Sequence, residues 1–190
     1  MARPSSRGAT EPPAPEIAAR LAITEVLYRY CRALDRMDRE LALSCWVDGG
    51  TDEHLPQFRG SASAFLDWLW PVHARFIQTR HMMGNVLIDL RGDRAGVESY
   101  VSIVLRARRD EGLVDLFTQG RYLDDFERVD GRWAIRHRRS VSEWHRVERV
   151  RETVADYNDP PLVAAAPPAG PPLKAARDRS DPSYGVLGES

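Results

Sequence analysis

The chain has 190 residues, which is enough for one domain of ordinary size. Its 27 basic and 28 acidic residues give a formal charge of -1. This balance argues against a nucleic-acid-binding protein, whose surface normally carries a basic excess. No apolar run approaches the ~20 residues that span a bilayer, and the N-terminus lacks the apolar stretch of a signal peptide. With only two cysteines, we expect neither a disulfide framework nor a thiolate zinc site. A scarcity of cysteines also fits a cytoplasmic location, which we expect.

The N-terminal part of the chain has the apolar spacing of helices. Residues 1–14 are rich in Pro, Ser and Ala without any periodicity, which predicts a disordered segment. From Pro15 to about Arg36, apolar residues recur at helical spacing and predict a long first helix. Tyr30 lies on the apolar stripe of this helix, so its ring should face inward and its hydroxyl needs a partner or a ligand.

Two further helices are predicted before the pattern changes. The first is short and begins at Asp38, a residue type that caps helix N-termini. The second spans residues 61–76, with Ser61 or Ser63 as its cap. Pro71 lies inside this segment and should kink or split the helix.

After Thr79 the apolar period changes from helical spacing to the alternation typical of β-strands. The stretch 49–60, interrupted by Gly and Pro, indicates a loop or a short strand. Three helices followed by an antiparallel meander predict an α+β domain over residues 15–150, with one curved sheet covered by helices on one face. The proline-rich residues 151–190 predict an extended tail, a candidate lid. The predicted strands of the meander are 81–90, 94–108, 113–129 and 132–144.

Two residues stand out as candidates for proton transfer. Asp35 lies near the C-terminal end of the first predicted helix, where the helix dipole disfavours a carboxylate. From the residues alone, a solvated ion pair with Arg32 or Arg39 explains it more simply. His81 opens the first predicted strand, and imidazole is the side chain best suited to proton transfer near neutral pH.

The other histidines and the arginines of the last strand carry weaker signals. His54 follows Asp52 by two residues, a spacing that suits a metal, but no further ligand accompanies the pair and no metal site is expected. His73 has a surface-like neighbour, Arg75, in the third helix. His137 shares its strand parity with Ile135 and should point into the core or a pocket. The arginines within residues 136–139 are expected on solvated strand faces.

Residues 16–147 together resemble the SnoaL-like branch of the nuclear transport factor 2-like superfamily. The resemblance rests on YCRALDR at the end of the first helix, FRGSASAFLDWLW, HMMGNVLIDL, GRYLDDFERVDGRWAIRHR and the closing SEW. The branch includes scytalone dehydratase, hexachlorocyclohexane dehydrochlorinase and the bile-acid 7α-dehydratase. The resemblance implies a cone-shaped α+β barrel, in which three N-terminal helices pack on a curved antiparallel sheet and enclose a pocket.

The resemblance also implies roles for three residues and no cofactor. By position in the family pattern, His81 is the base, Asp35 orients it, and Tyr30 hydrogen-bonds the substrate oxygen on which negative charge develops. Two arrangements found in relatives have no evident counterpart. These are the second pocket histidine of scytalone dehydratase and the Asp–Arg–Asp set of limonene epoxide hydrolase.

The function expected from this resemblance is a dehydratase-like or polyketide cyclase-like lyase or isomerase acting on a small hydrophobic cyclic substrate, such as a steroid, terpenoid or polyketide. The resemblance implies a homo-oligomer, either a trimer or a dimer. Two alternatives stay open, a non-catalytic module that binds a hydrophobic ligand and a small accessory subunit of an oxygenase. The walls of the substrate pocket are expected to come from aromatic residues: Trp46, Phe65, Trp68, Tyr100, Phe117 and Trp144.

Overall fold

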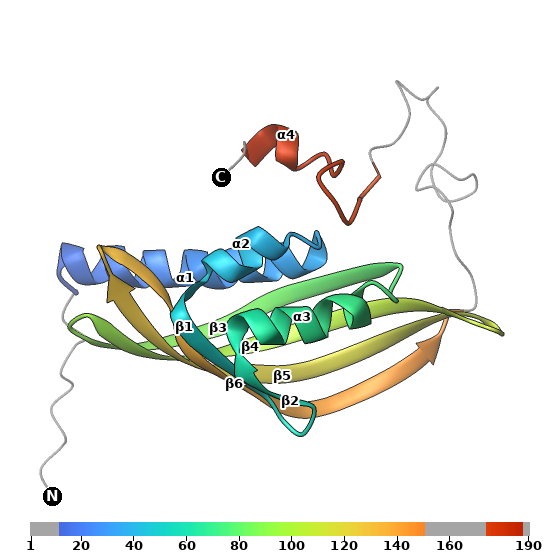
Figure 1. Cartoon of the computed structure of the whole chain (residues 1–190), viewed down its shortest axis with the longest axis horizontal. Helices are drawn as coiled ribbons and strands as arrows, with labels where there is room; N and C mark the ends of the chain where they lie inside the picture. Colours follow the sequence, from blue (N-terminus) through green and yellow to red (C-terminus); the bar gives the residue numbers. More distant parts are fainter. Residues whose placement is uncertain (1–11, 151–173, 188–190) are drawn as a thin grey trace, which may run out of the picture.

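Helices and strands form two layers in the computed structural model, which describes residues 12–150 and 174–187. The helical layer consists of α1 (Ala14–Asp35), α2 (Arg39–Ser44) and α3 (Ala62–His73). They lie over one face of a twisted sheet, with α1 running across it (Figure 1). The strands are β1 (Trp46–His54), β2 (Phe58–Ser61), β3 (Gln78–Arg91), β4 (Arg94–Arg109), β5 (Gly112–Val129) and β6 (Arg132–Arg149).

The helix boundaries follow from local capping chemistry. Pro15 lies in the first turn of α1, where its missing N–H costs nothing. The side chain of Asp38 accepts a hydrogen bond from the Leu41 backbone N–H and begins α2. Ser61 caps α3 in the same way through the Ala64 N–H. The helix continues past Pro71 and ends two residues later. The predicted caps of α2 and α3 are therefore confirmed.

The sheet is an open one with the strand order β2-β1-β6-β5-β4-β3. The meander β3 to β6 is antiparallel throughout, as predicted, and positive φ angles at Gly92 and Gly131 form two of its hairpin turns. The ambiguous stretch 49–60 forms most of an antiparallel hairpin, β1–β2, which joins the meander through a parallel pairing of β1 with β6. The sheet is curved but does not close into a barrel, because β2 and β3 remain edge strands.

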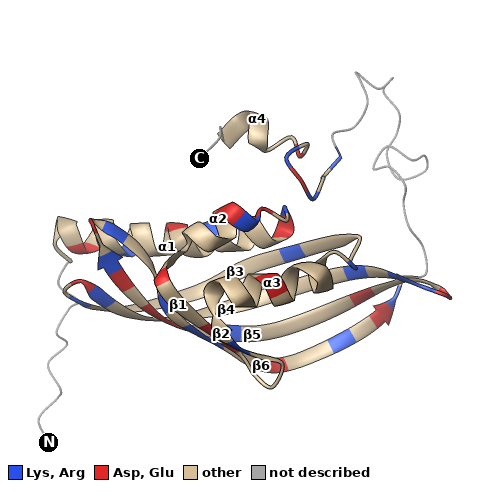
Figure 2. Cartoon of the chain, viewed as in Figure 1, with Lys and Arg blue, Asp and Glu red and all other residues tan. Residues whose placement is uncertain are grey.

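The core lies between the helical layer and the concave face of the sheet. Ile23, Leu27 and Leu34 of α1 and Leu66 of α3 are buried there, against inward-facing side chains of the strands. Acidic and basic residues are interspersed along the strands (Figure 2). None of the described helices is long and apolar enough to cross a membrane.

An irregularity in β6 decides which of its side chains enter the core. The register of β6 against β5 shifts between the pairs Asp125–His137 and Phe126–Ile135, which is the sign of a β-bulge at Arg136. Because a bulge inserts one residue, it reverses the alternation beyond it. His137, expected inward, instead contacts Thr51 through a 2.8 Å hydrogen bond at the partly exposed sheet surface. Arg138, expected on a solvated face, is fully buried.

The C-terminal part of the chain returns to the helical layer. Residues 174–187, which include the short helix α4 (Tyr184–Leu187), lie beside the ends of α1 and α2 (Figure 1). Their contacts with those helices fit the expectation of a lid, which stays a prediction. The rest of the predicted tail, and nearly all of the predicted disordered segment 1–14, lie outside the described residues.

Candidate functional site

Asp35 and His81 meet where the C-terminal end of α1 packs against β3. Asp35 is the last residue of its helix, and His81 is the fourth residue of β3, which begins at Gln78 rather than at His81. The Asp35 Oδ1 atom lies 2.6 Å from the His81 ring Nδ1, and Oδ2 accepts the His81 backbone N–H at 2.9 Å. Both side chains are buried. These two hydrogen bonds offset the unfavourable position of a carboxylate at a helix C-terminus.

The arrangement fixes the chemistry of the imidazole. Because Nδ1 faces the carboxylate at hydrogen-bond distance, it carries the proton in the neutral ring, and Nε2 is left as the basic nitrogen. When Nε2 takes a proton, the adjacent carboxylate stabilises the resulting imidazolium. The pair can therefore accept a proton at Nε2, and the carboxylate of Asp35 then balances the positive charge of the ring.

A cavity of about 740 Å³ adjoins the pair, a size that accommodates a small organic ligand. Its walls come from the end of α1, the first strand of the meander and the C-terminal segment. The lining residues are Asp35, Arg36, Ile77, Gln78, Thr79, Arg80, His81, Met82, Ala175, Ala176 and Arg177.

A second histidine, His73, lies against the first. Its ring stacks on that of His81 with centroids 5.7 Å apart and planes 25° from parallel. Burial, followed by the charge of a protonated His81, lowers the pKa of His73 to about 3, so this ring stays neutral at physiological pH. Its Nδ1 is buried without a hydrogen-bond partner among the described residues. The sequence carried a signal for it, since Leu66, Leu69 and His73 share the buried stripe of α3.

Tyr30 belongs to a different part of the core. It is fully buried, and its ring faces the Arg138 guanidinium at 4.3 Å and the edge of Tyr122. Its hydroxyl has no hydrogen-bond partner among the described residues, and burial raises its pKa well above the ordinary value. Tyr30 does not line the cavity beside His81. The structure thus joins Asp35 to His81 but does not bring the third expected catalytic residue to them.

Arg138 organises this second region, the inner cluster, which consists of Tyr30, Asp52, His54, Tyr122, Asp124 and Arg138. The Nε and Nη2 atoms of Arg138 each donate to Asp124 at 2.7 Å, and the Tyr122 ring lies 3.9 Å from the guanidinium carbon. Asp52 is the neighbour of Arg138 across the parallel β1–β6 pairing. The bulge in β6 turns Arg138 inward, so that it pairs with Asp124 and lies next to the strand that carries Asp52.

The inner cluster also contains a second histidine–aspartate pair. His54 Nδ1 hydrogen-bonds Asp52 Oδ1, and the His54 ring stacks on Phe65 with centroids 4.5 Å apart. Asp52 Oδ2 and Arg138 Nη1 have no hydrogen-bond partner within the described parts of the chain. The spacing that suggested a metal is thus used for a hydrogen bond between the two residues. In residues 12–150 and 174–187 no group of three or more His, Cys, Asp or Glu side chains is arranged to hold a metal ion.

The aromatic residues expected to wall the pocket lie elsewhere. Trp46 and Phe65 are core residues, and Trp68 packs on Phe58 and Phe65. Tyr100 and Trp144 are 44% and 51% exposed on the sheet face that points away from the helices. Strand alternation explains this, because the neighbours of Tyr100 on either side, Ser99 and Val101, are the buried ones. Phe117 lies on the same outer face, under Arg146.

Both cysteines are buried and free. Burial raises the pKa of each thiol to about 12, so both stay protonated and neither is a nucleophile at neutral pH.

Comparisons with solved structures identify the fold. The chain is similar to a candidate scytalone dehydratase from Novosphingobium aromaticivorans, with 24% identity, a TM-score of 0.64, and coverage of 72% of this chain and 91% of that chain. It is similar to the hexachlorocyclohexane dehydrochlorinase LinA-type3 from Novosphingobium barchaimii, with 17% identity, a TM-score of 0.62, and coverage of 74% and 97%. A variant of a Mycobacterium tuberculosis protein of unknown function has 25% identity, a TM-score of 0.59, and coverage of 82% and 88%.

These neighbours share the cone-like fold of the nuclear transport factor 2-like superfamily, in which helices pack on a curved sheet. No curated protein matches the chain. The model of the SnoaL-like domain matches residues 15–139, which include both members of the Asp35–His81 pair. By this match, the chain belongs to the SnoaL-like family.

Proposed function

We propose that this protein is a cofactor-independent lyase or isomerase of the dehydratase type, with His81 as the general base. The observation that carries the proposal is the buried Asp35–His81 pair beside a cavity of about 740 Å³. Two findings support the proposal: the chain belongs to the SnoaL-like family, and its fold is similar to that of a dehydrochlorinase. The proposed substrate is a small, largely apolar cyclic molecule such as a steroid, terpenoid or polyketide.

The proposed reaction begins with the transfer of a proton from a substrate carbon to Nε2 of His81. The electron pair of the broken C–H bond moves toward a neighbouring carbonyl oxygen, or expels a leaving group from the adjacent carbon. Asp35 balances the charge of the imidazolium through the hydrogen bond to Nδ1. Return of the proton to another carbon completes an isomerisation, and its transfer to the departing group completes an elimination.

The neighbours of His81 do not compete with it for the substrate proton. The stacked His73 ring has a pKa lowered to about 3 and therefore does not compete for the proton at neutral pH. Tyr30 is left out of the proposed mechanism, because its hydroxyl is buried in the inner cluster and not at the cavity.

The test is exchange of substrate C–H with solvent deuterium, followed by proton NMR with 2-decalone and 3-hydroxycyclohexanone as probes. Exchange by the wild type should exceed that in buffer, and His81→Ala should reduce the enzymatic rate by about 10²–10⁴-fold, the usual contribution of a general base. Asp35→Asn should reduce it at least about tenfold. His145→Ala, which removes an exposed histidine from β6, is the matched control.

Exchange that survives in both site variants would contradict the proposed role of the pair. A probe that binds the wild type without any exchange above the buffer rate would instead favour a ligand-binding module.

A further inference from the structure

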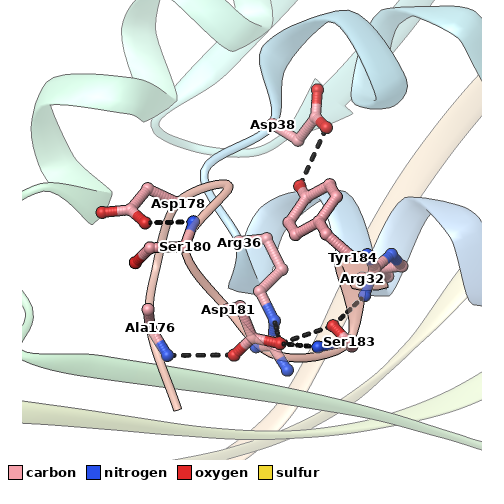
Figure 3. Close-up of polar contacts among 9 residues, drawn as sticks. All are labelled: Arg32, Arg36, Asp38, Ala176, Asp178, Ser180, Asp181, Ser183 and Tyr184. Atoms are coloured by element: carbon pink, nitrogen blue, oxygen red, sulfur yellow. Dashed lines mark hydrogen bonds and ion pairs between the residues drawn. The ribbon is translucent and has the colours of Figure 1, made fainter. Parts of the chain in front are cut away.

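The C-terminal segment, residues 174–187, reaches two helices that support the Asp35–His81 pair. It contacts the last turn of α1, at the end of which Asp35 lies, and it contacts the C-terminal end of α3. The last residue of α3, His73, stacks its ring on that of His81. Figure 3 shows the polar contacts of the segment with the end of α1 and the start of α2. One stretch of chain therefore joins the two supports of the pair.

Two contacts of the segment lie on either side of Asp35 along the chain. Three residues before it, the Arg32 guanidinium donates to Ser183 Oγ at 2.7 Å (Figure 3). Directly after it, Arg36 forms an ion pair with Asp181 at 3.2 Å (Figure 3). The segment therefore holds the backbone turn from which the Asp35 carboxylate reaches His81.

Tyr184 extends this attachment to the junction of α1 and α2. Its hydroxyl donates to Asp38 Oδ2 at 3.0 Å, while Asp38 Oδ1 caps α2 through the Leu41 N–H. The Arg32 guanidinium lies over the Tyr184 ring, 4.5 Å from its centre. Both oxygens of Asp38 are thus used, and the turn between the two helices is fixed from both sides.

Asp181 gives the segment its own shape. Its Oδ2 atom accepts the Ala176 backbone N–H at 2.9 Å, and its Oδ1 atom accepts the Ser183 backbone N–H at 3.1 Å. The same carboxylate, which is buried, pairs with Arg36. One carboxylate therefore folds the segment and ties it to the end of α1.

Arg177 makes the contact with α3. Its Nη1 atom donates to the carbonyl oxygens of His73 and Phe76 at 2.8 and 2.6 Å, where the helix ends. A cation is favourable at this position, because the last carbonyls of a helix carry partial negative charge. His73 is the residue whose ring stacks on His81, with centroids 5.7 Å apart. Arg177 therefore holds the helix end that packs against the proposed base.

The pair needs such support because its two members come from different elements. Asp35 is the last residue of α1, and the end of a helix is the part that opens most readily. A catalytic group is effective only when it is held within about 0.5 Å of its productive position. Contacts that fix the end of α1 and the end of α3 together meet this requirement.

We propose that residues 176–184 form a clasp that positions the Asp35–His81 pair, with Asp181 and Arg177 as its positioning residues. Asp181 holds the turn that carries Asp35, and Arg177 holds the end of α3 against the His81 ring. The catalytic consequence rests on the function proposed above. The effect of the clasp on the geometry of the pair does not require His81 to act as a base.

The first test measures the pair directly, in the full chain, by hydrogen exchange of the His81 backbone amide, which donates to Asp35 Oδ2. Asp181→Asn and Arg177→Gln should each lower the protection of this amide at least about tenfold, because local opening of the pair becomes easier. The amide of Tyr122, in the centre of the sheet, should keep its protection within about twofold. Unchanged protection of His81 in both variants, or equal losses at Tyr122, would overturn the proposal.

The second test separates positioning of the pair from a role as a cavity wall alone. Initial rates of C–H exchange over a range of 2-decalone concentrations give kcat and KM. Both clasp variants should lower kcat about 10–100-fold, because a displaced base is poorly aligned with the C–H bond. KM should stay within about threefold. Lys174→Gln removes an exposed charge from the same segment and is the matched control, which should change neither value. A higher KM at an unchanged kcat would overturn the positioning role.

Failure of this inference is distinguishable from failure of the proposed function. If the wild type does not exchange C–H, yet the His81 amide loses protection in Asp181→Asn and Arg177→Gln, the clasp stands and the catalytic proposal does not. If the wild type exchanges C–H and both variants match it in rate and in protection, the catalytic proposal stands and the clasp does not.

Discussion

The chain contains two histidine–aspartate pairs in different surroundings. Asp35 and His81 come from α1 and β3, 46 residues apart, and border a cavity with a positively charged wall. Asp52 and His54 are neighbours on β1, packed against aromatic rings and the Arg138–Asp124 ion pair. A hydrogen bond between the two residue types is common to both pairs. The Asp35–His81 pair borders a cavity of a size that a substrate could occupy, and a general base needs such access.

The largest expected effect is on the free energy of unfolding and concerns the inner cluster, which we expect to stabilise the fold. Arg138→Met leaves Asp124 buried without its partner and should lower the free energy of unfolding by about 3–5 kcal/mol, measured by urea denaturation. The double variant with Asp124→Leu removes the uncompensated charge and should recover most of this loss. A loss below about 1 kcal/mol in Arg138→Met would mean that the ion pair contributes little to the fold.

An intermediate effect concerns the ring stacked on His81. Folding lowers the pKa of His73 from about 6.5 to about 3, so the unfolded chain binds a proton at pH 5 that the folded chain does not. The contribution of His73 to the free energy of unfolding is therefore fully present above about pH 6.5, and it is lost as the pH drops toward 3. Between pH 7 and pH 5 the wild type should lose about 2 kcal/mol more than His73→Gln, measured by urea denaturation at both pH values. Equal losses would contradict the lowered pKa of His73 in the folded chain.

The smallest effect sharpens the comparison between the two pairs. His54→Asn should leave the rate of C–H exchange within about threefold of the wild type, because His54 packs on Phe65 and does not line the cavity beside His81. The same replacement at His81 should abolish the exchange. The deuterium-exchange measurement serves for both variants. Loss of exchange in His54→Asn at an unchanged content of folded protein would make the inner cluster part of the active site.

Local sequence signals predicted the elements of the fold and half of the site. The caps at Asp38 and Ser61 and the change of period after Thr79 lie within single segments, so a sequence pattern could identify them. The family resemblance pointed to Asp35 and His81, and the structure brings them to hydrogen-bond distance. His73 was missed because its neighbour Arg75 suggested a surface position, although the spacing from Leu66 and Leu69 placed it on the buried stripe.

The remaining site residues depended on events that no local pattern encodes. One extra residue in β6 exchanged the faces expected for His137 and Arg138. The aromatic residue type by itself does not indicate which face of a strand a side chain occupies, and alternation on β4 places Tyr100 on the outer face. Arg177 lies in a proline-rich tail whose return to α1 and α3 has no periodic signal.

The sequence by itself determined the order and type of the elements and the α+β class, because capping, periodicity and turn chemistry act within a few residues of one another. Only the tertiary structure decided that Asp35 meets His81, that Arg138 is buried, and that Arg177 forms a wall of the cavity. These contacts join segments 46, 14 and about 100 residues apart. They depend on strand register and on the packing of one layer against another, which are properties of the whole domain.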